Sequence, residues 1–197
     1  MKDFIKEWGL FILFITLLIL SRWLIWSPVT VDGHSMDPTL QDQEHLIMLK
    51  TTGIERFDIV VASETEATGE EKLIVKRVIG MPGDTIRYED DVLYVNDKKV
   101  DEPYLDQYKK AFTKDKLQDT YSYNVQFQSV ALAASAFTQD ASGQSTFTVE
   151  VPKGQYFLLG DDRLVSKDSR IVGTFEKSAI KGEVVFRMWP FKRIRFF

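Results

Sequence analysis

The sequence predicts a mainly β domain that is tethered by a single N-terminal membrane-spanning helix. A long apolar run near the N-terminus predicts the helix, and a series of short strand-like stretches separated by turn residues predicts the domain. At 197 residues, the chain has the length of one domain with appendages. Aromatic residues make up 13% and charged residues 27%, which is typical of a packed domain rather than a disordered chain.

The apolar run extends from Trp8 to Trp26, and Arg22 is its only charged residue. This is the length that a helix needs to cross a hydrocarbon core, and arginine and tryptophan suit its interfacial end. The alternatives are a cleaved signal peptide, for which the run is long and lacks a small-x-small site, and a core helix, for which it is too uniformly apolar. We expect a cytoplasmic tail over residues 1–7, a transmembrane anchor over 8–27 and an extracytoplasmic domain over 28–197.

Strand signals dominate the chain after the anchor, because β-branched, aliphatic and aromatic residues recur in short runs. Met81-Pro-Gly-Asp84 is a turn, and Asn96-Asp97 marks a hairpin. The expected strands are 44–49, 57–61, 73–79, 85–88, 92–95, 98–100, 145–151, 156–159 and 183–188. Tyr104–Leu117 is predicted to form a short helix. The pattern from Gln118 to Gly143 is weak and polar, so we expect an excursion from the main body around residues 104–150.

Composition excludes several classes of function. The net charge of −4 argues against a nucleic-acid partner. The absence of cysteine excludes disulfides, thiol nucleophiles and cysteine metal sites, and no metal or cofactor is expected. The C-terminal stretch Trp189–Phe197 mixes aromatic residues with cations, which suits contact with anionic lipid headgroups or, equally, an ordinary terminal strand.

A serine and a lysine are the candidate catalytic pair. Ser35 lies in a turn-rich segment just beyond the anchor, and Lys76 lies in a strand-like stretch where it shares a face with Ile74 and Val78. A free lysine is neutral only about once in 2,500 molecules at pH 7, whereas burial can lower its pKa by roughly 3–5 units. The alternative interpretations are that Ser35 is only a turn residue and that Lys76 interrupts an aggregation-prone apolar strand.

The two histidines are weaker catalytic candidates, and a polar loop supplies residues that could support the serine and the lysine. His34 is next to Ser35 and points away from it in an extended chain, and His45 has no accompanying motif. The polar loop Gly160–Arg170 follows an apolar strand directly. It supplies Ser166 to orient an amine, and it places Asp168 two residues from Arg170, so that these two can pair.

Together these segments resemble the type I signal peptidases, in the Gram-positive style with one N-terminal anchor. The resemblance rests on Ser35-Met-Asp-Pro-Thr-Leu40, Arg56-Phe-Asp-Ile-Val-Val61, Lys76–Asp84 and Gly160–Arg170, which occur in family order. It implies a β-rich catalytic domain of the signal-peptidase type. The activity it implies is a serine endopeptidase that removes signal peptides from secreted preproteins after a small-x-small motif.

The resemblance also implies roles for individual residues. Ser35 matches the nucleophile, Lys76 the general base, and Ser166 the serine that hydrogen-bonds the lysine. Met36 matches a residue near the substrate groove. Residues that hold the site together by polar contacts are matched by Arg77, Asp161, Asp168 and Arg170.

Two positions depart from the family pattern. Asp162 stands where an asparagine is common, so an extra carboxylate enters the loop. Gly33 stands where some members carry a hydroxyl residue that donates to the oxyanion. The Ser35 N–H is then expected to carry more of that work, with the Gly33 backbone or a water as the second donor. Leu40, Ile59 and Val75 are plausible neighbours of the substrate pockets.

The expected partners are secreted preproteins and membrane lipid, and the expected location is the cell membrane, with the catalytic domain on its outer side. Self-cleaving repressors share serine–lysine chemistry but carry a DNA-binding segment instead of an anchor. A catalytically silent relative that acts in surface-protein or pilus assembly is the other alternative. Such a relative is expected to lose the serine or the lysine, and both are present here.

Overall fold

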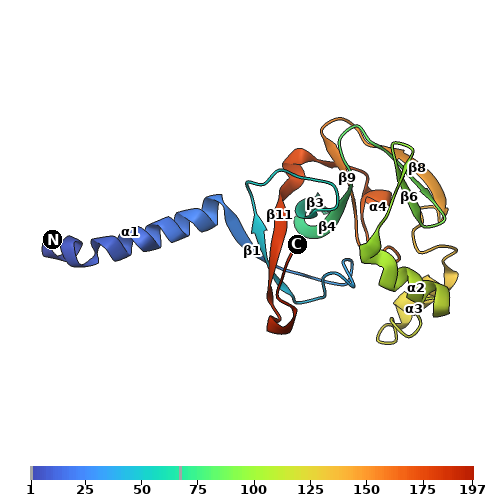
Figure 1. The fold of residues 1–197 in the computed structure, drawn as a ribbon, viewed down its shortest axis with the longest axis horizontal. Coiled ribbons are helices and arrows are strands. Elements are labelled where there is room, and N and C mark those ends of the chain that lie inside the picture. The colour runs from blue at the N-terminus through green and yellow to red at the C-terminus, as the bar shows by residue number, and fades with distance from the viewer. Residues whose placement is uncertain (1, 67) are drawn as a thin grey trace.

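The structure is a computed structural model that describes residues 2–66 and 68–197. Figure 1 shows helix α1 (Lys2–Leu24) extending away from a β-rich domain. Within the described residues, α1 is long and apolar enough between Lys6 and Leu24 to cross a membrane. The helix ends two residues before Trp26, which the sequence analysis placed in the anchor. Trp26 instead begins β1 (Trp26–Thr30), where Pro28 is tolerated because β1 lies at the sheet edge.

The larger sheet has eight strands, and it carries most of the predicted ones. Its order is β1-β2-β11-β3-β4-β9-β10, with β12 added to β11. The neighbouring strands β2 to β4, β9 and β11 all pair antiparallel. The bounds after β1 are β2 (His45–Leu49), β3 (Ile59–Thr65), β4 (Glu71–Gly80), β9 (Gln155–Leu159), β10 (Phe175–Glu176), β11 (Ile180–Trp189) and β12 (Arg195–Phe196).

The smaller sheet has four strands in the order β7-β6-β5-β8. They are β5 (Thr85–Glu89), β6 (Val92–Val95), β7 (Lys98–Val100) and β8 (Thr146–Glu150). The predicted Met81–Asp84 turn joins the two sheets, and the Asp84 N–H donates to the Met81 carbonyl at 3.0 Å. Gly83 takes φ +89° there, a backbone conformation that favours glycine. Tyr88, Leu93, Phe157 and Leu159 are among the residues that pack the core between the sheets.

A helical segment separates β7 from β8 and has its own small core. It contains η1 (Pro103–Leu105), α2 (Asp106–Asp115) and α3 (Val125–Ala133). The first two agree with the predicted helix, whereas α3 was not predicted. Asn124 begins α3, because its side chain accepts hydrogen bonds from the N–H groups of Gln126 and Phe127. The segment ends before Thr146, since β8 returns to the sheet, so the excursion is shorter than the predicted 104–150.

Three short helices complete the domain: α4 (Ser169–Val172), η2 (Lys177–Ala179) and η3 (Phe191–Arg193). The larger sheet has an apolar cluster on each face. Met36, Leu46 and Val61 belong to one, and Val60 and Val78 belong to the other. The predicted fold class, an N-terminal apolar helix followed by a β-rich domain, is confirmed.

Candidate active site

The loop between β1 and β2 holds Ser35 at the surface of the core. Met36 and Leu40 are almost fully buried on the apolar cluster beside β2 and β3. The Leu40 N–H donates to the Met36 carbonyl at 2.9 Å, which closes the turn. Because the residues after Ser35 are anchored in this way, the serine hydroxyl has a fixed position.

The Ser35 hydroxyl meets Lys76 from β4. The distance from Lys76 Nζ to Ser35 Oγ is 2.7 Å, although the two residues lie 41 positions apart. Lys76 stands opposite Val60 of β3 and is only 3% exposed, with Ile74 and Val78 on the same face. The sequence pattern predicted that Lys76 lies on a strand and shares an apolar face with Ile74 and Val78.

Burial lowers the pKa of Lys76 to about 8, against the opposing effect of the Asp168 and Glu64 carboxylates. At that pKa roughly one lysine in ten is neutral at pH 7, compared with about one in 2,500 for a free lysine. The amine is therefore able to accept a proton from Ser35 at neutral pH.

Asp168 and Arg170 form a buried ion pair close to Lys76. Arg170 donates to the Asp168 carboxylate through Nε and Nη2, each at 2.8 Å, and the Gly160 N–H donates to it at 3.0 Å. Although burial alone raises it, the pKa of Asp168 is held below its usual range by the Arg170 guanidinium. Because Arg170 compensates this carboxylate, Asp168 raises the pKa of Lys76 by less than burial lowers it.

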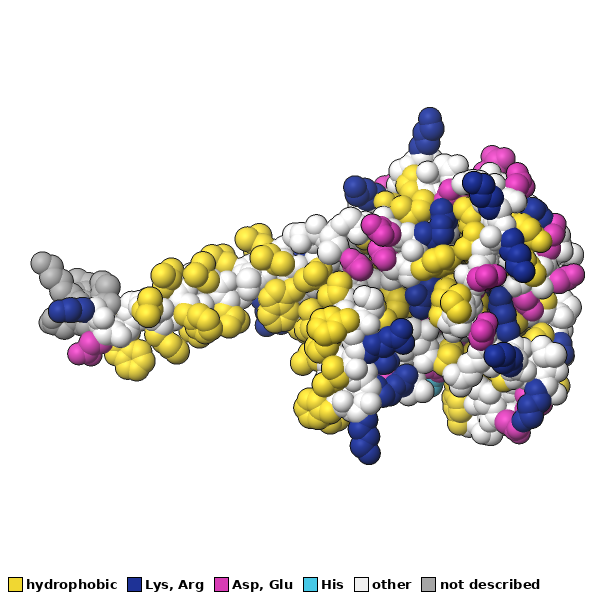
Figure 2. All heavy atoms as spheres, in the orientation of Figure 1, with side chains coloured by type: hydrophobic (Ala, Val, Ile, Leu, Met, Phe, Trp, Pro, Cys, Tyr) yellow, Lys and Arg dark blue, Asp and Glu magenta, His cyan; other side chains and the backbone are white. Residues whose placement is uncertain are grey.

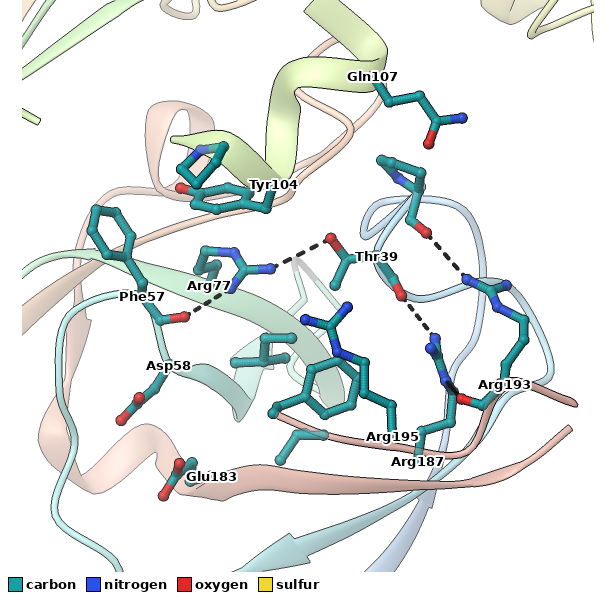
Figure 3. Close-up of a pocket in the computed structure, with 15 residues that line it drawn as sticks. Thr39, Phe57, Asp58, Arg77, Tyr104, Gln107, Glu183, Arg187, Arg193 and Arg195 are labelled. Carbon is teal, nitrogen blue, oxygen red and sulfur yellow. Dashed lines mark hydrogen bonds between the residues drawn. The ribbon is translucent and has the colours of Figure 1, made fainter. Parts of the chain in front are cut away.

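Arg77, the next residue along β4, points to the other side of the strand. Its Nε and Nη2 donate to Asp161 at 2.8 and 2.6 Å, and Nη1 donates to the Phe57 carbonyl at 2.8 Å. The guanidinium also lies 4.0 Å from the centre of the Tyr104 ring. Figure 3 shows it beneath that ring, in a cavity of about 620 Å³ that is separate from the cavity beside Ser35 and is called the second cavity. The other side of the second cavity carries Arg187, Arg193 and Arg195. Arg77 thus ties the strand of Lys76 to the loop after β9.

A cavity of about 470 Å³ opens beside Ser35 and Lys76. Its apolar lining includes Val29, Val31, Met36, Val61, Ile74, Val75, Phe127 and Val165. Val75 was predicted as a pocket neighbour and lies here. Leu40 packs in the core behind Met36, and Ile59 lines the second cavity instead. The lining suits small apolar side chains of a peptide.

Two sequence-predicted residues lie near the pair without the expected contact. Ser166 is buried, but among the described residues its hydroxyl has no hydrogen-bond partner, and the predicted bond to Lys76 is not formed. The Gly33 N–H donates to Asp42 Oδ1 at 2.8 Å, so it is engaged elsewhere. Within residues 2–66 and 68–197, the Ser35 N–H donates to no protein acceptor and is therefore available to an oxyanion.

The histidines make other contacts. His34 Nδ1 lies 2.9 Å from Asp37 Oδ2, and its ring packs on Tyr123 and Phe127. His45 Nδ1 lies 3.0 Å from the hydroxyl of Thr30. In the described part of the chain, neither ring forms a hydrogen bond with the Ser35 hydroxyl.

Sequence reasoning missed the contacts of the helical segment with the site. Phe127 lines the Ser35 cavity, and Tyr121 donates to Asp162. Arg163, which is fully buried, pairs with Glu102 and donates to the Gly160 carbonyl at 3.0 Å. The charges of Asp162 and Arg163 were the available signal in the sequence, but nothing local identifies their partners.

Comparison with known proteins identifies the family. Residues 5–189 match the family described as signal peptidase, peptidase S26. Signal peptidase I from Streptococcus pneumoniae is 58% identical over 200 residues, which cover 98% of this chain and 97% of the relative. Signal peptidase IB from Staphylococcus aureus is 37% identical over 203 residues, covering 100% and 95%. A crystal structure of a signal peptidase I from Enterococcus faecalis is 29% identical, covers 67% of this chain and 97% of its own, and has a TM-score of 0.47.

The family match extends over almost the whole chain, and the similarity to the curated relatives includes the N-terminal apolar helix as well as the β-rich domain. The resemblance that the sequence motifs indicated is therefore confirmed. The chain belongs to the signal peptidase family, peptidase S26, whose members are serine peptidases.

Proposed function

We propose that this protein removes signal peptides from exported preproteins on the outer face of the cell membrane, with Ser35 as nucleophile and Lys76 as general base. The observation that carries the proposal is the 2.7 Å contact between Ser35 Oγ and the amine of a buried lysine with a pKa of about 8. A hydroxyl nucleophile next to a desolvated amine is one established way to activate serine.

The reaction follows from this geometry. Neutral Lys76 takes the hydroxyl proton as Ser35 Oγ bonds to the scissile carbonyl carbon. The Ser35 N–H stabilises the resulting oxyanion. The Lys76 ammonium then protonates the leaving amine as the carbon–nitrogen bond breaks, which leaves an acyl-enzyme and a neutral lysine. A water attacks the ester, Lys76 accepts a proton from it, and that proton returns to Ser35 Oγ as the acyl group departs.

The supporting residues keep the pair in place. Arg77 with Asp161 joins β4 to the loop after β9, and Arg170 with Asp168 fixes that loop beside Lys76. Met36 lines the cavity that receives the substrate, whose residues at the first and third positions before the cut are small. The buried Ser166 hydroxyl, which has no partner among the described residues, is free to bond the Lys76 ammonium when it forms.

The N-terminal apolar helix and an apolar surface of the domain support a position of the site at the membrane. Figure 2 shows hydrophobic side chains along α1 and on the side of the domain that faces it. Met188, Trp189, Phe191, Ile194 and Phe196 are exposed near the C-terminus. Lys50 Nζ donates to the carbonyl of Trp23 at 2.9 Å and connects the helix end to the domain.

This surface, with Lys192 and Arg195 beside it, suits contact with lipid headgroups. We therefore propose a cytoplasmic tail before Lys6, an anchor over Lys6–Leu24 and an extracytoplasmic domain from Trp26 onward, in place of the predicted bounds 1–7, 8–27 and 28–197.

Cleavage of a precursor tests the function directly. Full-length protein in detergent is incubated with a preprotein, and the products are located by mass spectrometry. We expect a single cut after a small-x-small motif. An intact precursor, or a cut at unrelated sequence, contradicts the proposal.

A further inference from the structure

A buried hydrogen bond joins the helical segment between β7 and β8 to the loop after β9. Tyr121 Oη donates to Asp162 Oδ1 at 2.5 Å, and both side chains are fully buried. Tyr121 packs with Tyr108 and Phe137 in the core of the helical segment.

The backbone of Asp162 lies directly against the nucleophile. Its N–H donates to the Ser35 carbonyl at 3.1 Å, and its carbonyl accepts from the Ser166 N–H at 3.0 Å. Gly160, two residues earlier, is so close that an added Cβ would come within 2.4 Å of the Ser35 carbonyl oxygen. The loop after β9 and the backbone of Ser35 are therefore in direct, close contact.

The helical segment also contacts His34, the residue that precedes Ser35. The His34 ring centre lies 5.2 Å from that of Tyr123 and 5.8 Å from that of Phe127. Phe127 also lines the cavity that holds Ser35 and Lys76. The segment thus reaches the nucleophile from two sides, and Tyr121 provides its buried polar attachment to the Asp162 loop.

We propose that Asp162 is a positioning residue which, through its hydrogen bond with Tyr121, holds the Ser35 loop in register with Lys76. This inference rests on the proposed Ser35–Lys76 pair and extends it, since it assigns a function to the helical segment. The carboxylate acts on the backbone of Ser35 and not on the substrate.

The electrostatics of the Tyr121–Asp162 pair distinguish positioning from simple packing. Burial raises the pKa of Asp162 to about 7, and the Asp37 carboxylate adds to the rise while the Tyr121 hydroxyl opposes it. The groups that face Asp162 are Asp37, which pairs with His34, and the phenols of Tyr108, Tyr121 and Tyr123. At the pH where Lys76 is neutral, Asp162 is therefore ionised, and an ionised acceptor forms the stronger bond with Tyr121.

The raised pKa of Asp162 also lowers the stability of the folded protein. The folded protein binds more protons at this site than the unfolded chain between about pH 4 and pH 7. Stability falls as pH rises through that window, and the cost is fully present above about pH 7. Asp162→Asn, which has nearly the same shape, removes this cost together with the charge. Positioning thus predicts that kcat falls without a matching fall in stability, whereas a purely structural role predicts that the two fall together.

The test compares full-length Asp162→Asn, Tyr121→Phe, the double variant and Tyr108→Phe in detergent, at about pH 9, above both pKa values. For Asp162→Asn we expect kcat to fall about tenfold, KM to stay within about twofold, and the thermal midpoint to equal or exceed that of wild type. Tyr121→Phe should lose kcat to a similar extent, and the double variant no more than either single variant. Tyr108→Phe removes a hydroxyl from the same aromatic cluster without touching the bond, so its kcat should stay within about twofold.

The inference is overturned if Asp162→Asn keeps the wild-type kcat, or if its kcat falls only in step with its thermal midpoint. Additive losses in the double variant also overturn it, because they show that Tyr121 and Asp162 act independently. Ser35→Ala in the same assay separates this outcome from failure of the proposed function. A cleaving Ser35→Ala enzyme refutes the catalytic pair, whatever Asp162 does.

Discussion

Replacement of Ser35 or Lys76 by alanine is expected to abolish precursor cleavage, with a loss of at least about a thousandfold in kcat/KM. In the proposed mechanism, Ser35→Ala removes the atom that bonds to the substrate, and Lys76→Ala removes its proton acceptor 2.7 Å away. Lys76→Arg should be equally inactive, because a guanidinium stays charged and accepts no proton. Initial rates on a purified precursor measure the loss, and circular dichroism verifies that each variant is folded.

The double variant His34→Ala, His45→Ala is the matched control. Neither ring bonds the serine hydroxyl in the described part of the chain, so we expect kcat/KM within about tenfold of wild type, or roughly 1.4 kcal/mol in barrier height. A loss as large as that of Ser35→Ala would mean that a histidine is the base. Substantial turnover by Ser35→Ala, Lys76→Ala or Lys76→Arg would contradict the assignment itself.

Glu102→Ala is expected to give the largest loss of stability. Glu102 neutralises Arg163, whose side chain is fully buried and also donates to Tyr88 Oη at 2.8 Å. Removing the carboxylate leaves a buried guanidinium without a counter-charge, which costs about 3–5 kcal/mol. Because Arg163 also holds the Gly160 carbonyl, cleavage activity should decline along with stability. Denaturant unfolding of the full-length protein in detergent measures the change.

Lys114→Ala provides the contrast. Lys114 lies 2.8 Å from Asp119, but both side chains are exposed to solvent, and such surface pairs contribute little. No measurable change in the unfolding midpoint is expected. A Glu102→Ala protein as stable as wild type would show that Arg163 finds other compensation in the core.

The strands could be predicted from sequence where apolar residues recur in short runs, as in β2 to β6 and β9. The first strand could not, because Trp26–Thr30 directly continues the apolar anchor and contains Pro28, which is compatible with a strand only at an edge. Helix α3 carries no amphipathic pattern, and its stability comes from the Asn124 cap and from packing against α2. Such elements depend on tertiary contacts that a local pattern does not contain.

The candidate site likewise combines residues that the sequence identified with contacts that it did not identify. Ser35 and Lys76 were identified by residue type and by the apolar strand around the lysine. The Tyr121–Asp162 and Glu102–Arg163 bonds join residues 41 and 61 positions apart, and no spacing rule connects them. The engagement of the Gly33 N–H by Asp42 depends on the φ of +86° at that glycine and on the path of the loop beyond it.

The lowered pKa of Lys76 also has a consequence for stability. Because the amine titrates near pH 8 in the folded protein and near 10.4 in the unfolded chain, the unfolded chain binds more protons between these values. The burial cost is fully present below about pH 8, and the lysine contributes increasing stability as pH rises toward 10.4. Activity and the stability contribution of this one group therefore both improve as pH rises.

The most direct test of the Ser35–Lys76 pair is a pH–rate profile of kcat/KM on a peptide with alanine at the first and third positions before the cut. The profile is recorded for wild type and for Asp162→Asn, since Asp162 titrates near pH 7 and must not be mistaken for the base. With Lys76 as the base, Asp162→Asn loses about tenfold in kcat/KM per pH unit as the pH falls below about 8 and levels off above it. Wild type shows the same loss and, in addition, a further loss of about tenfold as Asp162 becomes protonated near pH 7. A rate that stays flat from acid to alkaline pH, on enzyme that is folded throughout, would contradict a titrating lysine base.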